Sequence, residues 1–363
     1  MASSFGKMLR VSVFGQSHGE AIGVLAEGFP VGEEVDLERL QRFMDRRRGA
    51  SAPGSTPRRE DDRPRFISGL YNGKTCGAPL CAVIENTNAD SSAYKGFEDT
   101  PRPGHADYTA AVKYSGFADM RGGGHFSGRL TAPLCAAGGV AKQILERRNI
   151  YIGAHIASVG AVRDESFPLF PARDELYAPG EKLMPVINDE AGAEMQRAIE
   201  AARADGDSVG GSIECAVIGL PAGVGEPMFE TIEGALAYAL FGIPAVKGVE
   251  FGSGFRAAEL RGSENNDGFA FSEDGRVVSA SNNSGGVLGG ISTGMPLVFR
   301  VALKPTPSIG KQQDTVSLGS RENRTISISG RHDACIVPRA VPVVEAAAAL
   351  VMLDLLLRGG LFK

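Results

Sequence analysis

Tryptophan is absent from the chain, no two cysteines are spaced as C-x-x-C, and neither sign of charge dominates. The cysteines are odd in number and scattered, which argues against a disulfide framework or a zinc site and favours a reducing compartment. The net charge of −5 gives no reason to expect a nucleic acid or an anionic membrane as a partner. We therefore expect a cytoplasmic protein without a bound metal. The five cysteines are Cys76, Cys81, Cys135, Cys215 and Cys335.

Long apolar runs are also lacking. The N-terminal stretch MASSFGKMLRVSVFG has neither a long apolar core nor a convincing cleavage site, so the sequence does not indicate secretion. The most apolar segment, 341–357, is interrupted by Glu345 and Asp354 and is too short to span a bilayer comfortably. Because it is apolar around most of its circumference, we predict a helix buried on several sides, in a layered core or, as a second interpretation, at a subunit interface.

Glycine is abundant instead. The chain has 48 glycines, about twice the usual share of ~7%. Many are clustered, as at 122–124, 210–211 and 285–286, but they are not periodic, which excludes collagen and simple linkers. Such clusters favour tight turns and backbone that lies close to another group. For any single cluster, a plain turn is the simpler interpretation.

The predicted helices and strands are mixed without a regular βαβ rhythm, and no G-x-G-x-x-G follows the first strand, so a Rossmann fold is disfavoured. From the pattern we predict an α+β fold in a single domain over 1–363. The run 46–65, rich in Arg, Pro, Gly and Ser, is expected to be a mobile loop after a helix that Asp36 caps and Gly49 ends. The other predicted helices cover 106–117, 131–148, 189–204, 229–241 and 340–358, and the predicted strands cover 8–14, 78–86, 212–219, 276–281 and 296–304.

Two polar segments in the first half carry histidines at predicted element ends. In GQSHGEAIG (15–23), His18 follows the first strand, where an imidazole suits proton transfer; a hydrogen bond within a turn is the simpler interpretation of an isolated S-H-G. In 102–132, His105 lies at a helix start where Asp107 fits the positive end of the helix. A capped helix followed by a glycine turn explains this second segment equally well.

A third segment, 281–309, joins a Gly/Ser/Asn loop to a strand and then to Lys304, Thr306 and Ser308. Backbone N–H groups, hydroxyls and an ammonium are the parts of a phosphate site, although the Walker order is absent. A hairpin with a Pro-rich exit is the competing interpretation.

A fourth segment, 330–346, gathers charge just before the apolar helix. Arg339 and its neighbours favour the ionised form of Asp333, which keeps a base available at neutral pH. The alternative is a surface ion pair, usually worth only ~0–1 kcal/mol.

Taken in order, these segments resemble the signature blocks of the chorismate synthase family. The blocks are G-x-S-H-G, R-P-G-H-A-D-Y-T, R-G-G-G, N-x-S-G-G-x-L-G-G-I-S-x-G, K-P-T-x-S, and G-R-H-D-x-C with P-R-A-V-P. The connecting pieces GDSVGG (206–211), PAGVGEP (221–227) and AVKGVEFGSGF (245–255) resemble the family too. The resemblance implies a lyase of aromatic amino acid biosynthesis that eliminates phosphate from 5-enolpyruvylshikimate 3-phosphate in an anti 1,4 sense, giving chorismate.

The resemblance also implies a β-α-β sandwich, with a helical layer between two antiparallel sheets, assembled as a homotetramer. It implies dependence on reduced FMN, with a link to NADP. Because no additional domain is present to reduce flavin, the reduced FMN is expected to be supplied from elsewhere. By matching motif positions, His18 is the acid near the phosphate, His105 the proton donor that holds the flavin's charge state, and Asp333 the base.

The substrate carries two carboxylates and a phosphate, so an acidic protein must gather arginines around it. The substrate-binding positions implied by the resemblance are Arg46, Arg47, Arg48, Arg102, Ser127, Arg129 and Arg339. The FMN-binding positions implied in the same way are Arg47, His125, Phe126, Ser127, Ala245, Gly289, Lys304, Pro305, Thr306, Pro307, Ser308 and Arg331.

The block GHFSGRLTA (124–132) departs from the family's usual G-R-S-S-A-R-E-T-A. His125 and Phe126 stand in place of an Arg and a Ser of the flavin site, and we interpret them as a subfamily variant in which the imidazole donates a hydrogen bond and Phe126 stacks. An alternative is a flavin-binding homologue that has lost turnover. A third hypothesis, a nucleotide-phosphate enzyme built on the loop 285–290, lacks both a Walker lysine and paired metal-binding acids.

Overall fold

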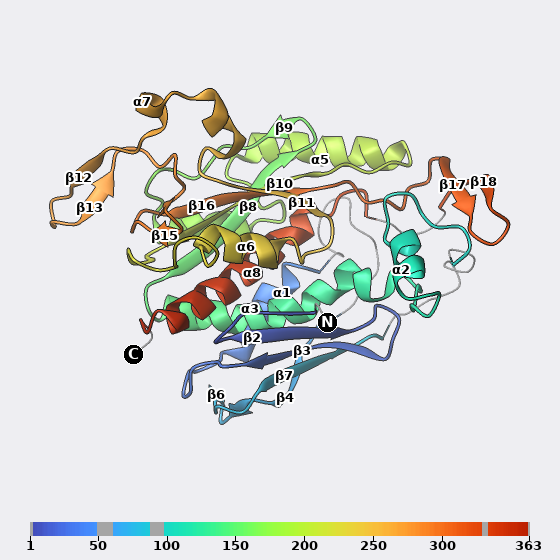
Figure 1. Cartoon of the computed structure of the whole chain (residues 1–363), viewed down its shortest axis with the longest axis horizontal. Coiled ribbons are helices and arrows are strands. Elements are labelled where there is room, and N and C mark those ends of the chain that lie inside the picture. The colour runs from blue at the N-terminus through green and yellow to red at the C-terminus, as the bar shows by residue number, and fades with distance from the viewer. Residues whose placement is uncertain (1–2, 49–60, 88–97, 329–332, 362–363) are drawn as a thin grey trace.

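Two five-stranded antiparallel sheets lie on either side of a layer of helices in the computed structural model (Figure 1). The structure describes residues 3–48, 61–87, 98–328 and 333–361. The first sheet has the order β1 (Ser4–Phe5), β2 (Arg10–Gly15), β3 (Ala21–Glu27), β7 (Leu80–Glu85) and β4 (Arg65–Ser68). The second has the order β11 (Val246–Phe251), β16 (Leu297–Leu303), β10 (Gly211–Ile218), β8 (Tyr151–Val159) and β9 (Val162–Arg163). This arrangement confirms the predicted α+β sandwich.

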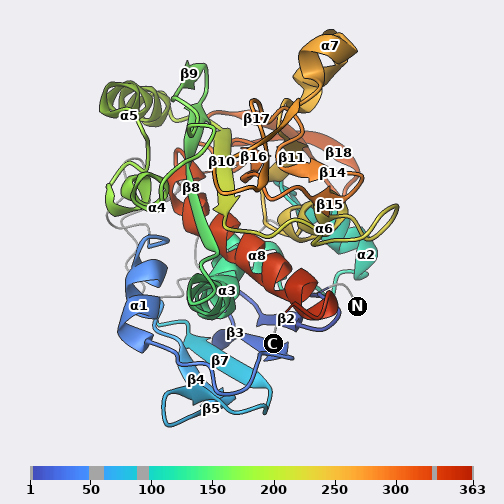
Figure 2. The same cartoon turned by 90° about the vertical axis from the view of Figure 1, so that its left-hand side faces the viewer.

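The helical layer consists of α1 (Leu37–Asp45), α3 (Thr131–Glu146), α6 (Ile232–Leu240) and α8 (Val337–Arg358). Helix α3 packs on β3 and β7 of the first sheet, α8 packs on β8 and β10 of the second, and the two helices pack on each other (Figure 2). Their contact is close because Gly138 has no side chain: a β-carbon there would lie 2.4 Å from Cβ of Ala346. Both helices are therefore buried along nearly their whole length.

Helix α8 extends over 22 residues and starts at Val337, earlier than predicted. Among the described residues it is the one helix that is long and apolar enough to cross a membrane by length and composition, but 94% of its apolar window is buried inside the protein. Its two acidic residues have partners: Glu345 pairs with Arg46 and Lys142, and Oδ1 of Asp354 accepts hydrogen bonds from three successive backbone N–H groups of residues 7–9. The core interpretation of this helix is confirmed.

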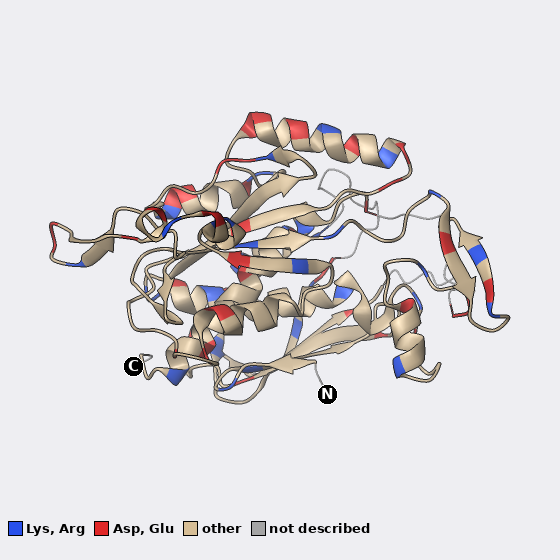
Figure 3. Ribbon diagram, turned by 45° about the horizontal axis from the view of Figure 1, so that its top comes forward, with Lys and Arg blue, Asp and Glu red and all other residues tan. Residues whose placement is uncertain are grey.

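The remaining elements lie outside these three layers. Helix α5 (Asp189–Ala204) covers the outer face of the second sheet, with Met195 and Ile199 buried beneath it and acidic and basic residues along its exposed side (Figure 3). The other helices are α2 (Asp107–Lys113), η3 (Gly124–Phe126), η4 (Gly128–Leu130), α4 (Arg173–Tyr177), η5 (Ala178–Glu181), η6 (Gly254–Glu259) and α7 (Gly262–Asn265). The short hairpins pair β5 (Leu70–Tyr71) with β6 (Lys74–Thr75), β12 (Phe269–Phe271) with β13 (Val277–Ser279), β14 (Val287–Leu288) with β15 (Ile291–Ser292), and β17 (Gln313–Ser317) with β18 (Glu322–Ile326).

The predicted helices and strands are confirmed to within a few residues at their ends. Asp36 caps α1, since its Oδ1 accepts a hydrogen bond from the backbone N–H of Arg39 at 2.9 Å. Gly49 and most of the predicted loop 46–65 lie outside the described residues. Three of the longer strands of the large sheets, β3, β8 and β11, were not predicted; β8 is buried at most of its positions and so lacks the alternation of a half-buried strand. Apart from β13, the short hairpin strands were not predicted either, because two to five residues carry too little alternation.

Candidate active site

Several element ends meet at one end of the helical layer. They are the ends of β2, β7 and β16 and the starts of α2, α3 and α8, and most of the predicted site residues lie on them. Hydrogen bonds connect these ends to one another across the sequence. Among the described residues, no group of three or more His, Cys, Asp or Glu side chains could hold a metal ion.

His18 follows β2 and is 7% exposed. Its Nδ1 lies 3.1 Å from Oγ of Ser17, and that hydroxyl donates to the backbone carbonyl of Arg121 at 3.1 Å. The imidazole rests against Gly122, where a β-carbon would lie 2.0 Å from Cε1 of His18. Gly122 has a φ of +68°, so glycine is needed here both for the backbone conformation and for the close approach of the ring.

His105 lies just before α2 in a cluster with Arg102 and Asp107. Nδ1 of His105 is 2.5 Å from Oδ1 of Asp107, and Oδ2 of Asp107 accepts from Nε of Arg102 at 2.7 Å. The opposite edge of the ring faces Gly123, the residue after Gly122: a β-carbon on Gly123 would lie 3.3 Å from Nε2 of His105. The two histidines therefore lie against successive residues, Gly122 and Gly123, and the structure brings them together.

The loop after β16 closes on the His105 segment. The Lys304 ammonium donates to the carbonyl of Gly104, and Nη1 of Arg102 donates to Oγ of Ser308 at 3.4 Å. Burial, together with the charge of Lys247, lowers the pKa of Lys304. Within the same loop, Oγ1 of Thr306 is a buried hydroxyl without a hydrogen-bond partner in the part of the chain that the structure describes.

A buried cluster of arginines joins the start of α8 to the His18 loop. Nη1 of Arg339 donates to Oδ2 of Asp333 at 2.5 Å, and its Nε donates to the carbonyl of Arg47 at 3.1 Å. Arg47 donates in turn to Oδ2 of Asp62 at 2.6 Å, and Oδ1 of Asp62 accepts from Arg129.

The cluster ends at Asn86, directly after β7. Nε of Arg129 donates to Oδ1 of Asn86 at 3.1 Å, and Nδ2 of Asn86 donates to the carbonyls of Gln16 at 3.0 Å and Gly19 at 2.9 Å, on both sides of His18. A series of hydrogen bonds therefore runs from Asp333 to the backbone carbonyls of Gln16 and Gly19 in the loop that carries His18. Burial opposes ionisation of Asp62, but the charges of Arg47 and Arg129 outweigh it, so the pKa of Asp62 is lowered.

The side chains of the three consecutive arginines that follow α1 have different partners. Arg47 enters the buried cluster, where it also donates to Oγ1 of Thr131 at 2.8 Å and to the carbonyl of Gly128 at 2.9 Å. Arg46 donates instead to Glu345 of α8 at 2.6 Å, and Arg48 donates to Asp45 at 2.8 Å near the surface. Of the three, Arg47 alone contacts the Asp62 cluster among the described residues.

His125 and Phe126 lie on η3, next to the glycine turn. Nδ1 of His125 lies 2.8 Å from the carbonyl of Gly15, and Nε2 lies 2.9 Å from Oγ of Ser3, so both ring nitrogens have partners in the N-terminal strands. The ring of Phe126 is 6.4 Å from that of Tyr114. In this structure the imidazole is directed towards the first sheet.

Two predicted flavin contacts, Ala245 and Gly289, lie beside opposite ends of β16. Ala245 has a φ of +74° and its carbonyl accepts from the backbone N–H of Lys304 at 3.0 Å, so it belongs to the Lys304 loop. Gly289 lies in the turn between β14 and β15, at the Leu297 end of β16. Seven residues of strand, about 20 Å, separate that end from Lys304. Within one chain these two positions are not brought together, and Arg331 lies outside the described residues.

Sequence reasoning missed Asp62 and Asn86, which organise the arginine cluster. Asp62 lies in the charged run EDDRPR, where nothing distinguishes it from Asp61. The structure gives it a φ of +45° and buries it to 4% exposure, which is unusual for a carboxylate. Asn86 is the last residue of the predicted strand 78–86 and directly follows β7, and a polar residue at the end of a strand was the available signal.

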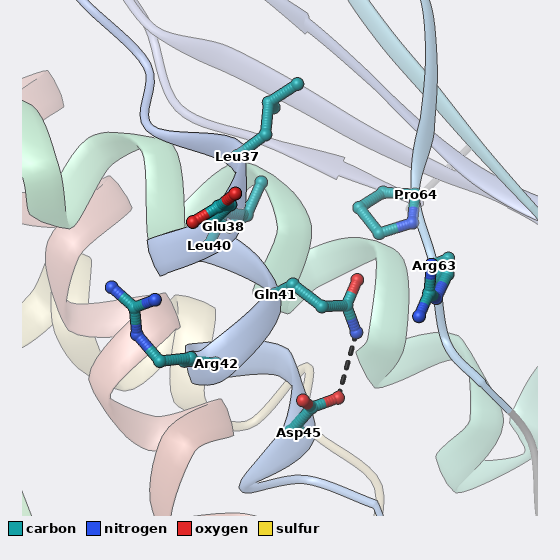
Figure 4. A pocket seen from close by; sticks show the side chains of 8 residues that line it. All are labelled: Leu37, Glu38, Leu40, Gln41, Arg42, Asp45, Arg63 and Pro64. Carbon is teal, nitrogen blue, oxygen red and sulfur yellow. Dashed lines mark hydrogen bonds between the residues drawn. The ribbon is translucent and has the colours of Figure 1, made fainter.

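A separate hollow lies on the outer side of α1 (Figure 4). It contains neither of the two histidine clusters, and its charged lining includes an internal hydrogen bond from Nε2 of Gln41 to Oδ1 of Asp45 at 2.9 Å. The lining residues are Leu37, Glu38, Leu40, Gln41, Arg42, Asp45, Arg63 and Pro64.

Comparison with known proteins gives a consistent result. The family model described as chorismate synthase matches residues 9–357. A chorismate synthase of Thermococcus kodakarensis is 51% identical over 354 residues, covering 97% of this chain and 97% of the relative, and one of Korarchaeum cryptofilum is 49% identical over 356 residues, covering 98% and 97%. A solved structure titled as a crystal structure of chorismate synthase superposes with a TM-score of 0.76 at 28% identity, covering 98% of this chain and 93% of that one.

Proposed function

Because this chain belongs to the chorismate synthase family, we propose that the connected cluster from His18 through Asp62 to Asp333, together with His105, is its active site. The enzyme is a carbon–oxygen lyase of aromatic amino acid biosynthesis. It eliminates phosphate from 5-enolpyruvylshikimate 3-phosphate to give chorismate, with no net redox change. The observation that carries the proposal is the series of hydrogen bonds that joins the His18 loop to Asp333.

We assign the proton transfers to three side chains. His18 donates a proton near the departing phosphate, and its burial between Ser17 and Gly122 holds the ring in one orientation. Asp333 accepts the proton lost from the ring, and its ion pair with Arg339 at 2.5 Å holds the carboxylate in place. His105 holds a proton next to the flavin. An acid and a base in separate ionic environments can work at one pH.

The substrate is a tri-anion, and the proposal places it against the arginine cluster. Arg102, Arg129 and Arg339 are the candidate ligands, since each is fixed by a carboxylate and guanidinium groups bind carboxylate and phosphate in a bidentate manner. Arg47 and Ser127 lie beside them. Direct substrate contacts from Arg46 and Arg48 remain predictions, because both side chains bind acidic partners away from this cluster.

The residues present fit a bound flavin nucleotide. The Lys304 ammonium and the buried hydroxyl of Thr306, which has no hydrogen-bond partner among the described residues, lie on one loop with Ser308. An ammonium with hydroxyls is the donor set that a phosphate ester requires. We propose that residues 304–308, with Ala245, hold the FMN phosphate, and that His125, Phe126, Ser127, Gly289 and Arg331 are further candidate contacts. Reduced FMN, when bound, supplies electron density as phosphate leaves and recovers it as the ring loses its proton.

We also propose that the active form is a cytoplasmic homotetramer that folds as one domain and receives its reduced flavin, linked to NADP, from a separate reductase. Family membership supports the need for reduced flavin. Nothing in the comparisons favours the alternative of a flavin-binding homologue without turnover.

An anaerobic assay tests the proposal. Purified protein receives chemically reduced FMN and 5-enolpyruvylshikimate 3-phosphate, and chorismate and inorganic phosphate are measured together. Equal amounts of both products, lost in a double His18→Ala, His105→Ala variant, support the active-site assignment. Flavin binding without product in the wild type would support the impaired homologue instead.

A further inference from the structure

The carboxylate of Asp107 is buried between an imidazole and a guanidinium. Asp107 is 2% exposed. Its Oδ1 lies 2.5 Å from Nδ1 of His105 and 2.8 Å from Nη2 of Arg102, and its Oδ2 accepts from Nε and from the backbone N–H of Arg102 at 2.7 and 3.0 Å. Four donors therefore hold this carboxylate rigidly at the start of α2, where the helix end also favours a negative charge.

The hydrogen in the short contact belongs to the imidazole. Burial disfavours ionisation of Asp107, but hydrogen bonds from Arg102 and His105 outweigh it and keep the pKa of Asp107 well below its usual range. An ionised carboxylate has no proton to donate, and two bare acceptors 2.5 Å apart would repel each other. Nη2 of Arg102 also lies 3.1 Å from Nδ1, but it donates to Oδ1 at the shorter distance of 2.8 Å. The 2.5 Å contact with Oδ1 therefore assigns a hydrogen to Nδ1, and Nε2 is the ring nitrogen left to exchange a proton.

Nε2 is directed at the glycine turn that also supports His18. A β-carbon on Gly123 would lie 3.3 Å from Nε2 of His105 and 3.5 Å from Cβ of Ser127. The neighbouring Gly122 is the residue that His18 contacts. The exchangeable nitrogen of His105 is thus presented on the side of the ring where the other site residues lie.

We propose that Asp107 is the positioning residue of His105: it fixes the hydrogen on Nδ1 and the plane of the ring, so that proton transfer uses Nε2 alone. The kinetic part of this inference rests on the proposed role of His105, whereas the tautomer does not. Asp107 touches no reacting atom in this role. It acts through the imidazole, as outer-shell carboxylates do for metal-bound histidines.

The tautomer is measured directly by ¹⁵N NMR of the full-length protein labelled only at histidine. The chain has five histidines, and a His105→Gln variant identifies the pair of signals from residue 105. In the wild type, the neutral form of His105 is expected to show a protonated Nδ1 and a bare Nε2. In Asp107→Asn, the fraction with hydrogen on Nε2 is expected to rise at least several-fold. A wild-type signal with hydrogen on Nε2, or an unchanged tautomer in Asp107→Asn, would overturn the proposal.

Asp99→Asn is the matched control, because Asp99 precedes the same segment but accepts from Oγ of Ser317 and the backbone N–H of Gly319. It should leave the His105 signals unchanged, and a tautomer shift of equal size would indicate a general loosening of the segment and overturn the specific role. If Asp107→Asn does not fold, Asp107→Glu is used instead, because it keeps the charge but moves it by one methylene. A smaller rise in the fraction of His105 with hydrogen on Nε2 is then expected.

The kinetic readout separates positioning from substrate binding. Asp107→Asn is expected to lower kcat by about 10- to 100-fold, as loss of a supporting partner typically does, while KM for 5-enolpyruvylshikimate 3-phosphate changes less than kcat. A rise in KM alone would show that Asp107 acts through Arg102, which overturns the proposal. An unchanged kcat in His105→Ala, with the tautomer shift present in Asp107→Asn, would reject the proposed role of His105 and leave the tautomer assignment standing.

Discussion

Oδ2 of Asp62 lies 2.6 Å from Nη1 of Arg47, and neither residue is more than 4% exposed. The other oxygen of the same carboxylate bonds Arg129, so one buried anion holds two buried cations in fixed positions. Burial lowers the pKa of Arg47, against the opposing charge of Asp62. The charge of the Asp62 carboxylate is therefore what allows the guanidinium groups of Arg47 and Arg129 to be buried side by side.

Asp62→Asn is expected to destabilise the fold by about 3–5 kcal/mol, because removing one partner of a buried ion pair leaves the other charge uncompensated. The free energy of unfolding in urea measures this effect. Asp61→Asn is the matched control: Asp61 pairs with Arg48 at 3.0 Å, but its side chain is 79% exposed. Its loss should cost only ~0–1 kcal/mol. Equal effects at both positions would contradict the buried role of Asp62.

The two histidines are expected to be needed for turnover and not for folding. His18→Ala and His105→Ala should each lower kcat by roughly 10²–10⁴-fold, the range that general acid–base groups contribute. Anaerobic turnover with reduced FMN measures the loss, and the urea midpoint serves as the control for folding. Wild-type rates in both variants would show that the proton-transfer roles are misassigned.

Gly122→Ala is expected to lower activity more than its effect on stability explains, because the new methyl group would occupy the position of the His18 ring, 2.0 Å from Cε1. Gly116→Ala is the control: Gly116 also has a positive φ, +81°, but nothing lies within 4 Å of its added β-carbon. Both changes should cost ~1–2 kcal/mol of backbone strain. A large loss of kcat in Gly122→Ala alone would support the contact, whereas equal kcat values in the two variants would contradict it.

Sequence periodicity predicted many of the individual helices and strands, whereas the two-sheet sandwich followed from the resemblance, and β3, β8 and β11 were not predicted. Buried positions alternate along β16 and surround α8 almost completely, so these elements could be identified from hydrophobicity. The partners of Glu345 and Asp354 could not, because Lys142 is 203 residues away from the first and the backbone of residues 7–9 is 345–347 residues away from the second. A charge in an apolar helix predicts that a partner exists, but not where it lies.

The site shows the same division. Recognisable motifs located His18 and His105, but only the fold shows that they lie against adjacent glycines. The arginine triplet illustrates why composition is not enough: in the turn that follows α1, Arg46, Arg47 and Arg48 contact three different surroundings. Asp61 and Asp62 are identical in sequence terms, and it is backbone conformation that buries the second.

His155 on β8 is expected to make stability depend on pH near neutrality. The residue is fully buried, with Nδ1 3.0 Å from Oδ2 of Asp164 and Nε2 3.3 Å from Oε1 of Glu214. Burial disfavours the imidazolium, but hydrogen bonds to Asp164 and Glu214 outweigh it and raise the pKa of His155 above 6.5. Since the folded state then binds this proton more tightly than the unfolded state, the contribution is fully present below pH 6.5 and is lost as pH rises through the raised pKa.

Urea unfolding between pH 6 and 9 should show a decline in stability over that window. His155→Gln is expected to remove the decline, and His125→Gln, the control, is expected to retain it. A decline of equal slope in His155→Gln would show that the proton is bound at another residue, because the wild type and this variant differ only at position 155.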